Sequence, residues 1–206
     1  MYYVLVGAAL FTLRPALSRG DIIDFDSQGL FGPPYFADAG PAQTLNITTS
    51  VGVVTFQGGV ILTAGAGNNV DTTSIYATGN GLGGGITNPL VINFPVLVTD
   101  FSIAVGNGEG LQITYTVSDT TGHSQSASIS SDGESVFGFP SIGPAVTVYA
   151  TPTARPNVPG LWDYWIDNIS FDAVPEPSSM ALSLLAVLGL GFAVRTVKKR
   201  SVQNSG

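Results

Sequence analysis

Two glutamates in the central part of the chain have the side-chain chemistry that glycan hydrolysis requires. Glycosidases place two carboxyl groups about 5 to 10 Å apart, and Glu109 and Glu134 are the only glutamates before residue 174. Both lie in apparent turns, because glycines flank the first and Asp132-Gly133 precedes the second. We expect solvated turn residues rather than a catalytic pair. The sequence therefore favours a protein that is not an enzyme, with a secreted glycan hydrolase as the alternative.

Nucleophilic and nucleotide-binding chemistry find little support. The single histidine, His123, lies in a polar turn, and no Gly-x-Ser-x-Gly elbow presents a serine. The chain has no cysteine, which excludes thiol catalysis, thiolate metal sites and disulfides. The run from Gly79 to Gly84 has the spacing of a dinucleotide fingerprint, but Ile86-Thr87-Asn88-Pro89 follows where a helix should begin. We expect a surface loop there.

Two aspartates near the start of the central region could bind calcium. Asp24 and Asp26 have the spacing of the first half of a calcium loop, but Tyr35 occupies the position that needs a bidentate glutamate, which excludes an EF-hand. In a second arrangement, these carboxylates and Asp167 hold Ca²⁺ between neighbouring strands. A structural Ca²⁺ is the one cofactor that we consider, and the alternative is that Asp24 and Asp26 simply face water.

Aromatic residues near the end of the central region could bind sugars. Trp162 and Tyr164 have amphipathic rings that can stack on sugar faces, and Asp163 between them can accept hydrogen bonds from hydroxyl groups. Side chains alternate along a strand, so Trp162 and Tyr164 share one face and Trp165 points to the other. We predict that Trp162 and Tyr164 lie at the surface and that Trp165 lies in the core.

The elements that would position these residues are β-strands. Apolar and polar residues alternate over 100–105 and 111–118, which predicts half-buried strands. Turn clusters rich in glycine and asparagine separate such runs, and no segment of the central region has a long 3.6-residue period. Further short strands are expected at 22–26, 45–49, 51–57, 60–63, 74–77, 90–94, 126–130, 145–150 and 164–171. Many short antiparallel strands bury a core best as two stacked sheets, so we predict an all-β fold, a β-sandwich of jelly-roll type.

The first and last strands of this sandwich are expected to lie side by side, as terminal strands often do in jelly rolls. Segments 21–26 and 162–171 form the two ends of the domain. Both resemble exported jelly-roll domains of the carbohydrate-binding-module type. In the alternative interpretation, the apolar residues of the last strand belong to the core and Asp167-Asn168 marks a bulge or a polar pair.

The central region, residues 21–173, is long enough for one domain with its own core. It is also strongly acidic. All 14 carboxylates of the chain lie in residues 21–179, where Arg155 is the only basic residue, so 1 − 14 gives a formal charge of −13. Such a surface repels nucleic acid and anionic lipid, tolerates neutral sugars and attracts divalent cations. We therefore expect no nucleic-acid partner.

The N-terminal segment resembles a secretory signal peptide. Residues 1–13 are apolar and uncharged, and Ala16 and Ser18 supply the small residues that a signal peptidase needs. No lysine or arginine precedes the apolar stretch, which leaves open a start upstream of Met1. We assign residues 1–20 to a signal peptide that signal peptidase cuts after Ser18 or Gly20.

The C-terminal segment, residues 174–206, has three parts. Pro175-Glu176-Pro177 cannot enter a helix interior, an apolar run follows at 180–194, and a basic end closes at 195–200. The cations of that end, which resist translocation, are Arg195, Lys198, Lys199 and Arg200. A transmembrane helix is predicted at 180–194. Its length of roughly 22 Å is less than a hydrocarbon core of about 30 Å, which favours a transient anchor over a permanent one.

This order of motif, apolar helix and basic end resembles the PEP-CTERM sorting tail of bacterial envelope and exopolysaccharide-associated proteins. The resemblance covers about the last 33 residues. It implies that an exosortase-type membrane protease recognises the tail, cuts near Pro175-Glu176-Pro177 and releases or re-anchors the domain. An ordinary single-span anchor is the alternative.

Together these features predict a non-enzymatic exported protein. It would be held at the cytoplasmic membrane by its C-terminal helix and then sorted to the cell envelope or the extracellular matrix, where it would contact exopolysaccharide. A purely structural matrix protein and the secreted glycan hydrolase stay open as alternatives.

Overall fold

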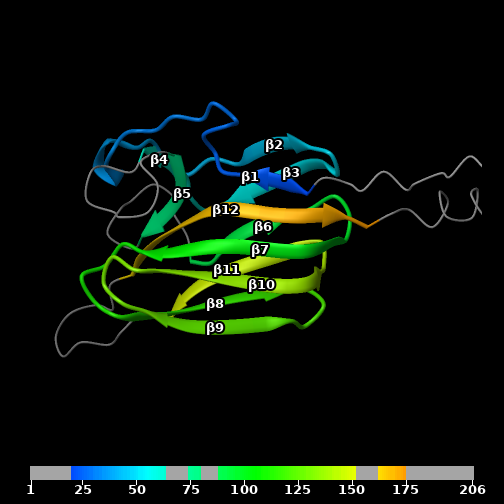
Figure 1. Cartoon of the computed structure of the whole chain (residues 1–206). Helices are drawn as coiled ribbons and strands as arrows, with labels where there is room; N and C mark the ends of the chain where they lie inside the picture. Colours follow the sequence, from blue (N-terminus) through cyan, green and yellow to red (C-terminus); the bar gives the residue numbers. More distant parts are fainter. Residues whose placement is uncertain (1–19, 64–73, 80–87, 152–161, 175–206) are drawn as a thin grey trace, which may run out of the picture.

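A computed structural model describes residues 20–63, 74–79, 88–151 and 162–174. Within these ranges the chain forms β-strands and one 3₁₀ helix, η1 (Phe36–Asp38), arranged as two layers (Figure 1). The strands are β1 (Asp21–Ile23), β2 (Leu45–Thr49), β3 (Gly52–Gln57), β4 (Val60–Thr63), β5 (Ser74–Gly79), β6 (Leu90–Asn93), β7 (Val98–Asn107), β8 (Ile113–Asp119), β9 (Ser124–Ile129), β10 (Glu134–Ile142), β11 (Ala145–Thr151) and β12 (Asp163–Ala173).

The strands form two six-stranded sheets in which every pairing is antiparallel. Sheet A has the order β10-β7-β12-β5-β4, with β1 also paired to β12, and sheet B has the order β2-β3-β6-β11-β8-β9. The two sheets enclose one large apolar core. The prediction of an all-β sandwich is confirmed, whereas the jelly-roll connectivity stays a prediction.

The core forms because alternate residues of each strand point between the sheets. In β8, Ile113, Tyr115 and Val117 are buried, and the intervening residues carry hydroxyl groups. Strand β7 contributes Phe101 and Ile103 from the opposite sheet. The alternation that predicted both strands therefore reports a real division between an inner and an outer face.

The predicted pairing of the terminal strands is confirmed. Strand β1 lies antiparallel to the end of β12, with Asp21 opposite Phe171. The register of β12 against β7 shifts between Asp167 and Ser170, and Asn168 has a φ of 48°. This is the bulge of the alternative interpretation of the last strand, in which its apolar residues belong to the core.

Strand β10 was not predicted, and its composition explains why. Gly138 and Pro140 interrupt it, and both residue types normally argue against a strand. The strand lies at the edge of sheet A, where it pairs only with β7. Proline is tolerated at an edge because its missing N–H removes no hydrogen bond from the sheet interior.

Several predicted segments lie outside the described residues. They include residues 1–19 of the predicted signal peptide, most of the glycine-rich run at 79–84 and the apolar run at 180–194. Gly79 itself ends β5. In the part of the chain that is described, no helix has the length and apolar character needed to cross a membrane.

Candidate functional site

Both ends of the folded body lie at the same end of the sandwich, which we call the tail end (Figure 1). Strand β12 runs to Ala173, so that Pro175 comes two residues after the last residue of the sheet. Gly20, at the other terminus, lies against this strand, because a Cβ built on it would be 2.9 Å from Asp172 Oδ1. The tail and the N-terminal segment therefore leave the domain next to each other.

The predicted sorting residues themselves lie outside the described residues. They are Pro175, Glu176 and Pro177 of the motif and Arg195, Lys198, Lys199 and Arg200 of the basic end. What the structure does establish is the position of the residue before the motif. Val174 is exposed at the tail end.

The opposite end of β12 carries a half-buried carboxylate. Asp163 begins the strand, and its carboxylate lies beside two glycines, since a Cβ on Gly79 or Gly108 would be 3.3 or 2.9 Å from Asp163 Cγ. Burial, and then the negative charge of Glu109, raise the pKa of Asp163 to about 7. A carboxyl group that is half-protonated near neutral pH can donate as well as accept a hydrogen bond.

A buried asparagine holds the loop that carries Glu109. Asn107 Nδ2 lies within hydrogen-bond distance of the carbonyl oxygens of Leu111, Ile129 and Ser130. Its Oδ1 accepts bonds from the Glu109 N–H at 2.9 Å and from the Tyr115 hydroxyl at 2.8 Å. The sequence indicated a turn here, and it missed that Asn107 is an internal anchor.

The predicted aromatic surface is only partly present. Tyr164 is fully buried: its hydroxyl donates to the Val148 carbonyl at 2.6 Å and accepts from the Leu90 N–H at 3.0 Å. The prediction of Tyr164 at the surface is therefore wrong. Alternation correctly put Trp162 and Tyr164 on one side, where their ring centroids are 5.9 Å apart, but this side faces the core. Trp162 is half-buried, and Trp165 is buried as predicted.

The three predicted calcium ligands are not brought together. Asp24 Oδ1 accepts bonds from the Ser27 N–H and hydroxyl at 2.8 and 2.6 Å, and Asp26 Oδ1 accepts from the Ser74 N–H at 2.7 Å. Asp167 is buried on β12. Within the described ranges, no three Asp, Glu, His or Cys side chains are grouped as a metal site would need. The two N-terminal aspartates instead shape the turn after β1, in which Phe25 has a φ of 57°.

The histidine turn is structural. His123 Nδ1 lies 3.1 Å from Asp119 Oδ2, and the Asp119 carboxylate also accepts the N–H groups of Thr121 and Gly143 at 2.9 and 2.7 Å. Burial raises the pKa of Asp119, but the bonds from Thr121, Gly143 and His123 together outweigh it and hold that pKa below its usual range. This aspartate ties the β8–β9 turn to the β10–β11 turn.

The two glutamates of the hydrolase alternative differ in position. Glu109 lies in the loop between β7 and β8, as predicted. Glu134 is the first residue of β10, opposite Gly106, rather than a turn residue. The carboxylate that the structure couples to Glu109 is Asp163, which sequence reasoning had considered only as a sugar ligand.

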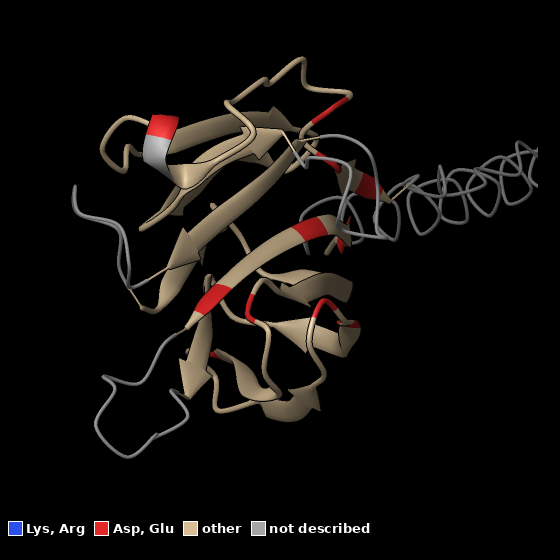
Figure 2. Cartoon of the chain, turned by 90° about the vertical axis from the view of Figure 1, so that its left-hand side faces the viewer, with Lys and Arg blue, Asp and Glu red and all other residues tan. Residues whose placement is uncertain are grey.

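The outer face of sheet B carries no charge. We call it the hydroxyl face. Its outward side chains are Asn46, Thr48, Val53, Thr55, Gln57, Val91, Asn93, Thr114, Thr116, Ser118, Ser124, Ser126, Ser128, Ala145, Thr147, Tyr149 and Thr151. Ten of these seventeen are serine or threonine. The described ranges contain twelve carboxylates and no lysine or arginine, and Figure 2 accordingly shows red segments and no blue ones in the described part of the chain. The acidic residues therefore lie elsewhere on the molecule.

Hydrogen bonds between neighbouring strands order the hydroxyl face. Thr116 and Ser126 are joined at 2.7 Å, and Ser118 and Thr147 at 2.8 Å. A third hydroxyl pair, between Thr114 and Ser128, is also 2.8 Å apart. Tyr149 stands on β11 beside these pairs with 42% of its surface exposed. The result is an array of paired hydroxyl groups beside one aromatic ring.

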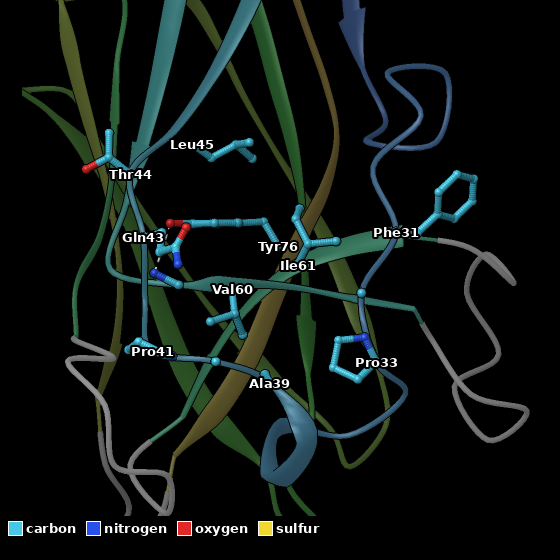
Figure 3. Close-up of a pocket in the computed structure, with 13 residues that line it drawn as sticks. Phe31, Pro33, Ala39, Pro41, Gln43, Thr44, Leu45, Val60, Ile61 and Tyr76 are labelled. Atoms are coloured by element: carbon cyan, nitrogen blue, oxygen red, sulfur yellow. Dashed lines mark hydrogen bonds between the residues drawn. The ribbon is translucent and has the colours of Figure 1, made fainter.

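A small groove lies beside the edge strand β4 (Figure 3). Its volume is about 270 Å³, and none of the thirteen residues that line it is charged. The segment after β1 forms one wall and approaches β4 closely, since a Cβ on Gly32 would be 2.0 Å from the Ile61 carbonyl oxygen. Tyr76 contributes a hydroxyl that accepts the Gly59 N–H at 2.9 Å. Sequence reasoning missed this groove because it depends on an irregular segment.

The fold and the exit of the chain define an all-β domain with a C-terminal sorting segment. A model of the PEP-CTERM protein-sorting motif matches residues 173–199, which confirms the resemblance of the tail. No curated protein matches the chain. The motif implies an exported protein that an exosortase processes at the membrane.

Proposed function

We propose that this chain is a non-enzymatic protein that an exosortase sorts to the cell envelope or the extracellular matrix, where its hydroxyl face binds neutral exopolysaccharide. In this proposal residues 1–20 direct export through signal peptidase, the helix at 180–194 holds the precursor in the membrane, and the domain is a jelly roll. The sorting motif directly after β12 carries the first half of the proposal.

The uncharged character of the hydroxyl face carries the second half. An acidic protein gains solubility from charge at any exposed position, yet the outer face of the six-stranded sheet B has none. Paired hydroxyl groups can exchange hydrogen bonds with sugar hydroxyls, and Tyr149 offers a ring for stacking. A neutral polymer meets no electrostatic penalty there.

The sorting half is tested by replacing Pro175, Glu176 and Pro177 with alanine in the native cell. The intact mass and the location of the two proteins are compared. We expect the unmodified chain outside the membrane, shortened near the motif, and the variant at full length in the membrane. If both stay in the membrane at the same mass, the tail is only an anchor and the matrix proposal loses its support.

The binding half is tested with charge on the hydroxyl face. Thr116→Glu and Thr147→Glu are placed together, and Ser141→Glu, which adds one charge on the exposed edge strand β10, is the control outside the face. The probes are the exopolysaccharide of the native cell and insoluble cellulose. We expect the double variant to lose retention and the control to keep it. Equal retention of all three proteins would contradict binding at this face, and no retention of any would leave the structural matrix protein as the better account.

A glycan hydrolase is the second candidate, because the structure couples two carboxyl groups. Burial and then the charge of Glu109 raise the pKa of Asp163 to about 7, and Glu109 follows Gly108, on which a Cβ would be 2.9 Å from Asp163 Cγ. A raised acid with a second carboxyl group nearby is the arrangement that such enzymes use. Asp163→Asn and Glu109→Gln should each abolish any hydrolysis of the native exopolysaccharide. Hydrolysis that survives both changes would exclude this pair.

A further inference from the structure

We propose that a ring of apolar side chains around the exit of the tail is a docking surface for the sorting protease. The proposal rests on the proposed function, because it takes exosortase processing of the chain as given. We call this surface the exit rim. Its members are Ile22, Val53, Val96, Leu97 and Val174.

Exposed apolar residues are concentrated at the tail end. In the described ranges, nine large apolar side chains are exposed, and five of them form the exit rim. The exposed fractions include 59% for Ile22 and 54% for Leu97. Val53 belongs to both surfaces, because it lies on the hydroxyl face where β3 begins. The four residues outside the rim are spread over the segment after β1, the edge strand β10 and the rest of the hydroxyl face. A concentration of exposed apolar surface marks an interaction site, whereas single exposed residues need no explanation.

The fold brings the rim residues to the same end of the sandwich. The antiparallel pair Val98 and Ala173 places the two adjacent residues, Leu97 and Val174, side by side. The turn before β3 reaches the same place, since a Cβ on Gly52 would be 3.1 Å from the Pro95 ring. Val53 and Val96 follow these two contact residues in the chain.

Strand β1 completes the rim. The Asp21 carboxylate accepts the Ser50 N–H at 2.7 Å, which ties the strand to the turn between β2 and β3. Ile22 stands next to this aspartate, opposite Ser170 of β12. The rim therefore includes residues of both sheets and lies at the end from which the tail departs.

The position of the motif indicates which partner binds the rim. Pro175 directly follows Val174, so any protein that reads residues 175–177 comes within one residue of the rim. Asp21 and Asp172 lie among the rim residues and would be repelled by anionic lipid. A protein partner is therefore favoured over the membrane surface, and the protease is the partner that the motif brings there.

The test measures the rate of tail processing in cells that carry the protease. The full-length chain is pulse-labelled, and its conversion to the shorter mass is followed. Val96→Gln with Leu97→Gln is compared with Tyr35→Gln and Val136→Gln, which remove apolar side chains that are even more exposed and lie outside the rim. We expect processing of the rim variant to slow several-fold and that of the control to match the unmodified chain. Wild-type speed for the rim variant overturns the proposal.

A linker variant supplies an independent readout. About ten Gly and Ser residues are inserted between Val174 and Pro175. Once the motif is bound, such a flexible linker lowers the effective concentration of the rim at the protease surface, so the two contacts no longer support each other. We expect slower processing. A linker that leaves the rate unchanged or raises it would mean that the folded body only hinders the protease, and this also overturns the proposal.

Two further comparisons separate the causes of failure. If the unmodified chain and the variant with alanine at 175–177 are both left uncut, the proposed function fails and the rim proposal falls with it. In cells without the protease, the rim variant should stay on the membrane as firmly as the unmodified chain during salt washes. Weaker retention would show that the rim contacts lipid, which overturns docking to the protease.

Discussion

The outer faces of the two sheets differ in what covers them. On sheet A a second apolar cluster, separate from the main core, is covered by η1 and its neighbours. Its buried members are Val60, Leu62, Ile75, Ala77 and Trp165, and Phe36 and Ala39 pack against them. On sheet B the outward side chains are mostly hydroxyls and lie open. One face thus buries apolar side chains beneath a covering segment, and the other is open to solvent.

The largest expected effect comes from the covered face. Trp165→Ala should lower the free energy of unfolding by about 3–5 kcal/mol, because it leaves a cavity in the second cluster. The ring lies directly over Gly106, where a Cβ would be 1.9 Å from Trp165 Cε2. Because Gly106 has no side chain, it cannot fill the space that the ring leaves. Urea unfolding followed by far-UV circular dichroism measures the change.

The matched change on the open face is Tyr149→Ala. This side chain is 42% exposed and should cost less than about 1 kcal/mol. Equal losses from Tyr149→Ala and Trp165→Ala would break the distinction between a structural face and a free one.

The second effect concerns the end of sheet B rather than its face. Asp119→Ala removes the acceptor for the N–H groups of Thr121, His123 and Gly143, and should cost about 1–3 kcal/mol. Because the pKa of Asp119 is lowered in the folded state, its contribution is fully present above the unfolded pKa of about 3.8 and is lost progressively as the pH falls from there toward the much lower folded pKa. The difference in the free energy of unfolding between Asp119→Ala and the unmodified chain should therefore be largest at pH 7, begin to shrink below about pH 4 and still be measurable at pH 3.

His123→Ala is the control for the Asp119 variant. It removes one exposed partner and leaves the backbone N–H bonds in place, so that its cost should stay within about 1 kcal/mol. A loss as large as that of Asp119→Ala would place the stabilisation in the ion pair instead of the backbone bonds.

The third effect has the opposite pH dependence and belongs to sheet A. The pKa of Asp163 rises from 3.8 to about 7 on folding, so the folded state holds a proton that the unfolded chain has lost between these two values. Stability from this group therefore falls as the pH rises from about 4 to 7. At pH 4, Asp163→Asn should unfold at a urea concentration similar to that of the unmodified chain. At pH 8, its free energy of unfolding should be about 1–2 kcal/mol higher than that of the unmodified chain.

Glu109→Gln checks the cause of that shift. It removes the negative charge and leaves the burial of Asp163, so it should reduce the pH dependence without abolishing it. The assignment of this pH dependence to Asp163 would be contradicted if the free energy of unfolding of the unmodified chain rose between pH 4 and 7 and neither substitution altered that rise.

The sequence predicts those features of the fold that depend on local patterns. Alternation identified β7 and β8. It also put Trp165 on the opposite face of the last strand from Tyr164, and Trp165 is buried, although in the second cluster rather than in the main core. It could not say which face of β12 turns inward, because alternation groups side chains without orienting them, and Tyr164 was misplaced for this reason. The orientation follows from contacts with Leu90 and Val148, which are distant in the sequence.

The features of the candidate sites that sequence reasoning missed are non-local as well. The pKa of Asp163 depends on Glu109, more than fifty residues earlier in the chain, and the groove beside β4 needs an irregular segment that carries no periodic signal. The hydroxyl face escaped notice because each strand supplies only two to four of its side chains. The sorting tail was recognisable because its three parts are contiguous.

The smallest expected effect tests whether the hydroxyl pairs on the open face exist for stability. Thr116→Val and Ser126→Ala remove one cross-strand pair that is 2.7 Å apart. Such pairs contribute about 0.2–1 kcal/mol, and here water can replace the lost partner, so a double-mutant cycle in urea should give a coupling near the lower limit. The same double variant should retain less exopolysaccharide than the unmodified chain. A coupling above about 1 kcal/mol with unchanged retention would instead make the hydroxyl ladder a structural device, and both sheets would then stabilise the fold through their outer faces.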